Sequence, residues 1–76
     1  MSDKNVQLDL TRSEALVLFE WLARSEDSLM FENESEQKVI WGLQARLEKS
    51  LDEPFLPDYA SRLAQARRDV LGTSAL

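Results

Sequence analysis

The feature that most constrains the fold of this chain is one alternating segment near its N-terminus, Val6-Gln7-Leu8-Asp9-Leu10. In an extended chain, Val6, Leu8 and Leu10 lie on one side and the two polar residues on the other, which is typical of a half-buried β-strand. A strand needs partners for its backbone N–H and C=O groups, and no later segment alternates in this way. The sequence therefore predicts that residues 6–10 pair with another polypeptide.

Three partners fit this segment. Antiparallel pairing with its own copy would bring Val6, Leu8 and Leu10 of two chains together in a homodimer. In the second arrangement, the apolar side lies on the first two helices of the same chain as an extended arm, without a sheet. The third partner is the sheet edge of a different protein.

Two helices after this strand have clear start signals. Thr11 and Glu14 fit a capping box, in which the hydroxyl accepts from the third helical N–H and the carboxylate accepts from the cap's own N–H. We therefore expect a helix over 12–24. Asn33 is a second cap, and the acids that follow it suit the positive end of a helix over 34–51.

Two prolines separate the second helix from a third. Pro54 and Pro57 each disfavour helix at the preceding residue and remove a backbone donor. A helix over 58–71 follows, with a natural stop at Gly72. The predicted fold class is therefore mainly α, with a short strand at 6–10 followed by three helices in a small bundle and the strand paired across a homodimer.

Apolar residues recur at helical spacing within each predicted helix, and we expect one face of each helix to form the core. The first face comprises Ala15, Leu18, Phe19, Leu22 and Ala23, with Leu16 at its margin. The second comprises Val39, Ile40, Leu43, Leu47 and Leu51. Between the first two helices, Leu29 or Phe31 is expected to tuck into the core. Phe55 and Leu56 are expected to anchor the proline turn.

Length and composition limit the kinds of protein this can be. The 76 residues make a single domain (1–76), close to the size at which one core is only just sufficient. The chain has neither cysteine nor histidine, which excludes disulfides, thiolate chemistry and the commonest metal ligand. We expect residues 1–5 and 73–76 to fray. Because no apolar run is long enough to span a membrane, the expected location is the cytoplasm.

No catalytic or cofactor-binding pattern stands out. Gly42 and Gly72 are the only glycines, so the glycine-rich loops that cradle nucleotide phosphates are absent. The acidic run from Glu26 to Glu36 lacks the order of a calcium loop. Paired carboxylates would need a cleft that separates their pKa values. We therefore predict a protein that is not an enzyme and has no cofactor, metal or small-molecule substrate.

The charge distribution argues against a general nucleic-acid binder. A net charge of −5 repels phosphate backbones. Acidic residues concentrate between positions 26 and 58, whereas the segment after residue 59 is basic. Such clusters either pair with each other or form solvated helix faces.

Both tryptophans fall outside the apolar faces of their helices, which makes them the strongest candidates for a binding site. Trp21 lies with Val17 off the main face of its helix, and Trp41 lies with Ala45 beside the small Gly42. Tryptophan is strongly enriched at binding hot spots. In the alternative interpretation, each indole is buried against the arm or the third helix. The predicted partner-binding residues are Val17, Trp21, Trp41, Ala45, Glu26, Asp27, Glu32 and Glu34.

These features favour a small acidic cytoplasmic protein–protein interaction module, a homodimer that regulates, adapts or inhibits one protein target. The order of strand, capped helix, turn and helix over residues 6–51 also resembles the ribbon-helix-helix repressors, which implies a dimer that inserts its paired strands into the DNA major groove. Gln7 and Asp9 would then face the DNA, where a carboxylate beside phosphates is unfavourable. A third alternative is an acidic inhibitor that occupies the nucleic-acid-binding surface of a nuclease or similar enzyme.

Overall fold

The computed structural model describes residues 4–72, which contain three α-helices and one short 3₁₀ turn. The elements are α1 (Arg12–Arg24), α2 (Glu34–Ser50), η1 (Glu53–Phe55) and α3 (Tyr59–Gly72). The predicted helix at 12–24 is confirmed at both ends. The other two helices differ from their predicted bounds by one residue at one or both ends. The mainly helical fold class is therefore confirmed.

Side-chain caps set the starts of α1 and α2. The Thr11 hydroxyl accepts from the Glu14 backbone N–H at 3.0 Å, and the Glu14 carboxylate accepts from the Thr11 N–H at 2.8 Å. At α2, the Asn33 side chain accepts from the Glu36 backbone N–H at 3.0 Å. These bonds satisfy N–H groups that have no partner within the helix, so the local sequence is enough to fix both starts.

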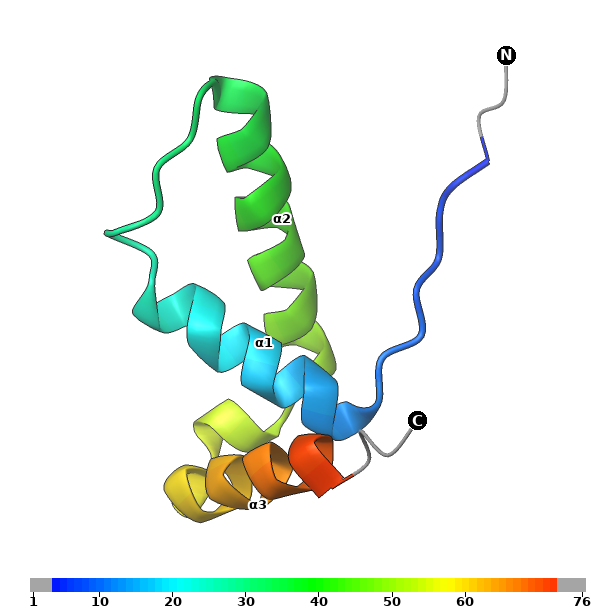
Figure 1. Cartoon of the computed structure of the whole chain (residues 1–76), viewed down its shortest axis with the longest axis vertical. Coiled ribbons are helices and arrows are strands. Elements are labelled where there is room, and N and C mark those ends of the chain that lie inside the picture. The colour runs from blue at the N-terminus through cyan, green and yellow to red at the C-terminus, as the bar shows by residue number, and fades with distance from the viewer. Residues whose placement is uncertain (1–3, 73–76) are drawn as a thin grey trace.

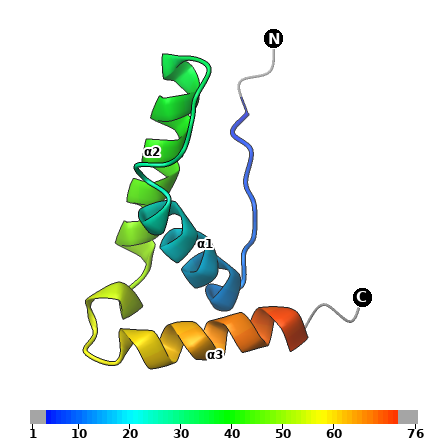
Figure 2. The same cartoon turned by 60° about the vertical axis from the view of Figure 1, so that its left-hand side comes forward.

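The helices form an open, angular arrangement around α1. Helix α3 packs against α1 and crosses beneath it (Figure 1). Helix α2 stands beside α1, and its N-terminal part rises beyond the end of α1, so the two make fewer contacts than α1 and α3 (Figure 2). Residues 25–33 form the loop that climbs from α1 to the start of α2.

Seven buried residues from α1, the end of α2 and α3 form the core. They are Leu16, Phe19, Leu22, Leu47, Leu51, Leu63 and Ala66. Two predictions for α1 are wrong: Leu16 is buried rather than marginal, and Ala23 is exposed. The buried face of α1 is rotated from the predicted face toward Leu16, because α3 covers that side of the helix. Val39, also predicted in the core, is 65% exposed, since it lies in the half of α2 where Ile40 alone packs against the core.

Residues 6–10 do not lie in a strand within the single chain, so their pairing with another polypeptide stays a prediction. No strand occurs in residues 4–72, and this segment instead leaves α1 as an extended arm that stands apart from the helices (Figures 1 and 2). Val6 is 88% exposed and Leu8 81%. The alternative in which the arm lies with its apolar side on the first two helices is therefore wrong. A strand needs a neighbouring strand, and the described residues supply none.

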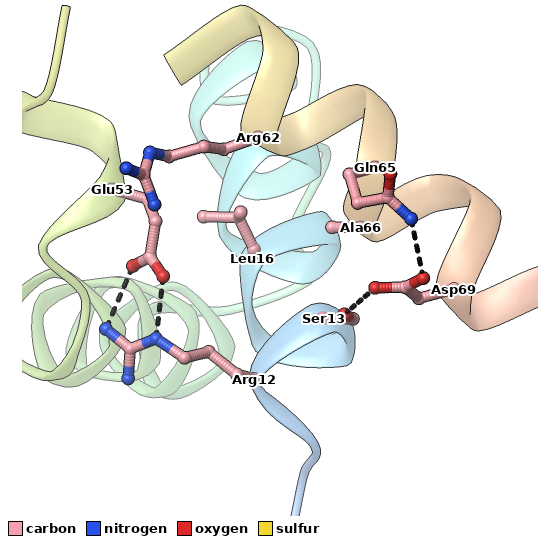
Figure 3. Close-up of a pocket in the computed structure, with 8 residues that line it drawn as sticks. All are labelled: Arg12, Ser13, Leu16, Glu53, Arg62, Gln65, Ala66 and Asp69. Atoms are coloured by element: carbon pink, nitrogen blue, oxygen red, sulfur yellow. Dashed lines mark hydrogen bonds and ion pairs between the residues drawn. The ribbon is translucent and has the colours of Figure 1, made fainter. Parts of the chain in front are cut away.

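The connecting segments bury less apolar surface than predicted. Leu29 and Phe31 are half-buried, and neither belongs to the core cluster. Phe55 is exposed, so its predicted anchoring role is wrong, whereas Leu56 is half-buried. From η1, it is Glu53 that reaches α1, where it accepts a hydrogen bond from Arg12 (Figure 3).

Two further predictions concern the ends of the chain and membranes. We predicted that residues 1–5 and 73–76 fray. Most of these residues, 1–3 and 73–76, lie outside the described part of the chain. Between residues 4 and 72, none of the helices combines the length and the apolar character needed to cross a membrane.

Candidate functional site

A polar hollow of about 240 Å³ lies where α1, η1 and α3 meet (Figure 3). Its lining residues are Arg12, Ser13, Leu16, Glu53, Arg62, Gln65, Ala66 and Asp69. The Arg12 guanidinium donates two hydrogen bonds to the Glu53 carboxylate, from Nε to Oε2 at 2.6 Å and from Nη2 to Oε1 at 2.9 Å. This bidentate pair ties the start of α1 to η1.

Other polar groups of the hollow are also paired within the chain. The Ser13 hydroxyl donates to Asp69 Oδ2 at 3.1 Å, and the Gln65 amide donates to Asp69 Oδ1 at 2.8 Å. Arg62 forms an ion pair with Asp58 at 2.8 Å. Because its charged groups are engaged in the chain itself, the hollow is a clasp that holds α1, η1 and α3 together rather than a ligand site.

These pairings shift pKa values in the direction that favours the charged forms. The hydrogen bond from Arg12 holds the pKa of Glu53 below its ordinary value, and the same bond raises the pKa of Arg12. The hydrogen bond from Arg62 likewise lowers the pKa of Asp58. All these groups therefore keep their usual charge at neutral pH, and none is placed near neutrality as a catalytic acid or base would be.

A second polar contact between α1 and α3 is partly buried. The Tyr59 hydroxyl donates to Glu20 Oε1 at 2.8 Å. Burial of the phenol, followed by its bond to the Glu20 carboxylate, raises the pKa of Tyr59 to about 12. The tyrosine is therefore neutral at physiological pH, and its contact with Glu20 is structural.

A shallow apolar hollow of about 310 Å³ surrounds Trp21 between α1 and α3. Its lining residues are Glu14, Val17, Leu18, Trp21 and Val70. The Trp21 side chain is 44% exposed, while Val17 packs against the core. The alternative in which this indole is buried against the arm or α3 is therefore wrong, although Val70 of α3 lies beside it. The hollow is a concave apolar surface with one large aromatic side chain open to solvent.

A larger hollow of about 780 Å³ lies along the outer face of α2. Its lining residues are Glu34, Gln37, Lys38, Val39, Trp41, Gly42 and Arg46. All of them belong to α2, on the side away from Leu43 and Leu47, which pack in or against the core. Trp41 is 55% exposed, so this indole is not buried either. Residues on this face have no covering element in the described chain.

Gly42 lies within this hollow, next to Trp41. Apart from its chain neighbours and the backbone of its own helix, a Cβ atom at Gly42 would meet no atom within 4 Å in the described chain, so no packing contact there requires a glycine. Glycine inside a helix costs about 1 kcal/mol relative to alanine. That cost has no visible compensation within the monomer.

The predicted partner-binding residues are not gathered at one place. Val17 and Trp21 share one hollow, whereas Trp41 and Glu34 share the other, and the two hollows have no residue in common. The remaining predicted residues are exposed but line neither hollow: Ala45, Glu26, Asp27 and Glu32. The chain thus presents two separate apolar surfaces rather than a single tryptophan interface.

Some lining residues were not found by sequence reasoning. Lys38 and Arg46 lie four residues before and after Gly42, and this spacing on one helix face is a signal that could have found them. Val70 joins the Trp21 hollow because α3 packs against α1. No sequence spacing indicates that approach, since it depends on the tertiary structure.

The surface area of the whole chain is large for its mass. It exposes 6408 Å², against about 4700 Å² expected for a compact monomer of its mass. The extended arm contributes to this excess, and so does the uncovered face of α2.

Neither metal chemistry nor similarity to known proteins assigns a function. Among residues 4–72, no group of acidic side chains is placed to hold a metal ion. Comparisons of the chain with protein-family models, curated proteins and solved structures found no match. What the protein does is therefore inferred from its own geometry.

Proposed function

We propose that this chain is a small acidic protein–protein interaction module that binds one protein target and has no enzymatic activity. The observation that carries the proposal is the exposure of large apolar side chains on the arm, around Trp21 and along α2, beside a core of seven residues. Exposed apolar surface is unfavourable in water, and contiguous patches mark interaction sites. The cytoplasmic location remains a prediction from the sequence.

The hollow around Trp21 supplies the buried centre of the proposed contact with the target. Trp21 offers a large amphipathic ring, and the neighbouring Val17 and Val70 form an apolar seat for a side chain of the target. The Arg12–Glu53 pair and the Tyr59–Glu20 bond stiffen the two helices that carry this seat. A rigid seat loses less conformational entropy when it binds.

Acidic residues favour a target with a basic surface. Glu26 and Asp27 lie exposed directly after α1, the helix that carries Trp21, and Glu32 lies further along the same loop. Exposed charges of one sign speed the encounter with an oppositely charged partner and disfavour partners of the same sign. In this proposal the indole supplies affinity, and the acids supply rate and specificity.

The arm is the proposed contact with a second copy. Val6 and Leu8 are exposed on an extended backbone, and their side chains alternate with polar residues. Antiparallel pairing of residues 6–10 with the same residues of a second chain would provide both backbones with hydrogen-bond partners and bring the apolar side chains together.

The proposal is tested by capturing a partner from cells with the immobilised chain, purifying that partner and titrating it against the chain while recording indole fluorescence. We expect Trp21→Ala to weaken the reconstituted complex about thirtyfold, which corresponds to a hot spot of about 2 kcal/mol. Phe55→Ala is the matched control, because Phe55 is an exposed aromatic residue outside the three surfaces. Its affinity should equal that of the wild type.

Two results would contradict this proposal. One is a reconstituted partner that binds Trp21→Ala and the wild type equally. The other is salt-sensitive binding of duplex DNA in a gel shift, which would favour the ribbon-helix-helix alternative instead.

A further inference from the structure

We infer that the outer face of α2 binds an acidic segment of a partner protein, in which acidic residues alternate with apolar ones. The inference goes beyond the proposed function, which is centred on Trp21, because it assigns a ligand to a second and separate surface. Its basis is a basic strip on α2, formed by Lys38, Arg46 and Lys49, with exposed apolar side chains on both sides.

The basic strip occupies one narrow side of the helix. At about 100° per residue, five residues of α2 fall within an arc of about 80°: Lys38, Lys49, Gly42, Ser35 and Arg46. Along the helix axis, Lys38 and Lys49 are about 16 Å apart. The arc contains no acidic residue, so the strip is a line of positive charge on a chain whose net charge is −5.

The three cations of the strip are available to bind acidic groups. All three residues are exposed, and within residues 4–72 no ion pair involves any of them. Arg46 and Lys49 lie three residues apart, a spacing at which like charges on a helix repel each other. The strip is therefore unfavourable for the chain alone, and the carboxylates of a partner would remove that repulsion.

One apolar side chain lies on each side of the strip. Val39 is about 20° from Arg46 around the helix, and Trp41 is about 60° from Lys38 on the opposite side. Both apolar side chains are more than half exposed, and both line the same hollow as Lys38 and Arg46. A partner that alternates acidic with apolar residues would place carboxylates on the strip and apolar groups at its edges, where their burial adds affinity.

Gly42 leaves room between the two cations of the hollow. It lies four residues after Lys38 and four before Arg46, so both long side chains can reach the space above it. Because this position has no Cβ atom, the backbone or a carboxylate of the partner can approach the helix surface closely. The inferred contact is therefore centred on Gly42.

Charge also favours a protein segment over a nucleic acid. Glu34 and Glu48 lie within about 20° of Trp41 around the helix, one before it and one after it. A phosphate backbone carries a charge at every nucleotide, so phosphates beside a base stacked on Trp41 would meet these acids. A protein segment avoids this repulsion, because its apolar residues rather than its acids lie against Trp41.

Fluorescence anisotropy tests the inference with a labelled peptide in which glutamate and leucine alternate over about eight residues, enough to cover the strip in extended form. The peptide should bind the wild type, and binding should weaken as salt is added. Lys38→Gln combined with Arg46→Gln should weaken binding about tenfold, because two charged contacts are lost. Arg24→Gln combined with Arg68→Gln is the matched control, since it removes the same charge from α1 and α3, and should bind as the wild type does.

Two further variants locate the bound peptide. Gly42→Ala should weaken binding severalfold while raising the thermal midpoint of the chain, an opposite pair of effects that a purely structural role would not produce. Trp21→Ala should leave binding of this peptide unchanged, because the Trp21 hollow and the α2 hollow have no residue in common.

The outcomes separate this inference from the proposed function. Salt-sensitive binding that is weakened by the paired substitutions at 38 and 46 but not by those at 24 and 68 supports the α2 contact. The inference is overturned if the peptide does not bind the wild type, if a peptide with glutamine in place of glutamate binds equally, or if a single-stranded oligodeoxynucleotide binds more tightly than the peptide. In any of those cases the proposed function survives if Trp21→Ala still weakens a reconstituted partner, and it fails if that variant binds normally.

Discussion

The two halves of this molecule handle their apolar residues in different ways. Where α1 meets α3, leucine and alanine side chains are buried, and hydrogen bonds from Arg12 and Tyr59 close the edges of the contact. Along the arm and the outer face of α2, valine, leucine and tryptophan side chains stay exposed, with no covering element in the described residues. The comparison shows that the first region stabilises the fold, whereas the apolar side chains of the second contribute little burial within the described chain.

The largest expected effect breaks the packed region. Leu22 is 2% exposed, and Leu22→Ala should cost about 2 to 5 kcal/mol through lost burial and a residual cavity. That is a large share of the roughly 4 to 11 kcal/mol expected for a domain of this size. Urea unfolding followed by circular dichroism measures the change.

Val39→Ala on the exposed face is the control for this comparison. It removes an apolar side chain of similar kind but should change the unfolding free energy of the monomer by less than about 0.5 kcal/mol. Equal costs for Leu22→Ala and Val39→Ala, measured under dilute conditions, would show that the two regions do not differ as described.

A smaller effect tests the partly buried contact between α1 and α3. Tyr59→Phe removes the bond to Glu20 and should cost about 1 kcal/mol at neutral pH. Because folding raises the pKa of Tyr59 from 10.0 to about 12, the tyrosine's contribution is complete below pH 10 and is lost as the pH rises toward 12. Between pH 10 and 12 the variant should therefore lose less stability than the wild type. Thermal unfolding of both proteins at several pH values measures this difference.

The smallest expected effect concerns the Arg12–Glu53 clasp. Folding lowers the pKa of Glu53, so its contribution is present above the ordinary carboxyl pKa and is lost as the pH falls through the lowered value. Glu53→Gln should lower the thermal midpoint by only a few degrees at neutral pH, because Arg12 is largely exposed. It should also flatten the acid side of the stability profile.

Arg12→Gln provides a check on the same clasp from the other partner. It should flatten the acid side in nearly the same way, because the pair with Glu53 is the close one; the longer contact of Arg12 with the exposed Asp52, at 3.9 Å, should add little. If the two variants give different acid profiles, Glu53 owes its lowered pKa to another group.

The candidate surfaces were only partly predictable from the sequence. Trp21 and Trp41 were placed off the core faces by helical spacing, and both indoles are in fact exposed. The sequence did not indicate that they belong to two different surfaces, because the distance between α1 and α2 faces depends on how the helices cross. Val70 was missed for the same reason, since it reaches the Trp21 hollow from α3.

The sequence alone determined, to within one residue, where the helices of this protein begin and end. Thr11, Asn33 and the two prolines act through bonds and steric limits within a few residues, so no distant contact is needed to interpret them. Only the tertiary structure decided which arc of each helix is covered, as Leu16 and Val39 demonstrate. Periodicity shows which residues share a helix face, but a face is buried only where a second element packs on it. Helix α3 crosses α1 and covers Leu16, whereas the N-terminal part of α2 extends beyond α1, so Val39 stays exposed.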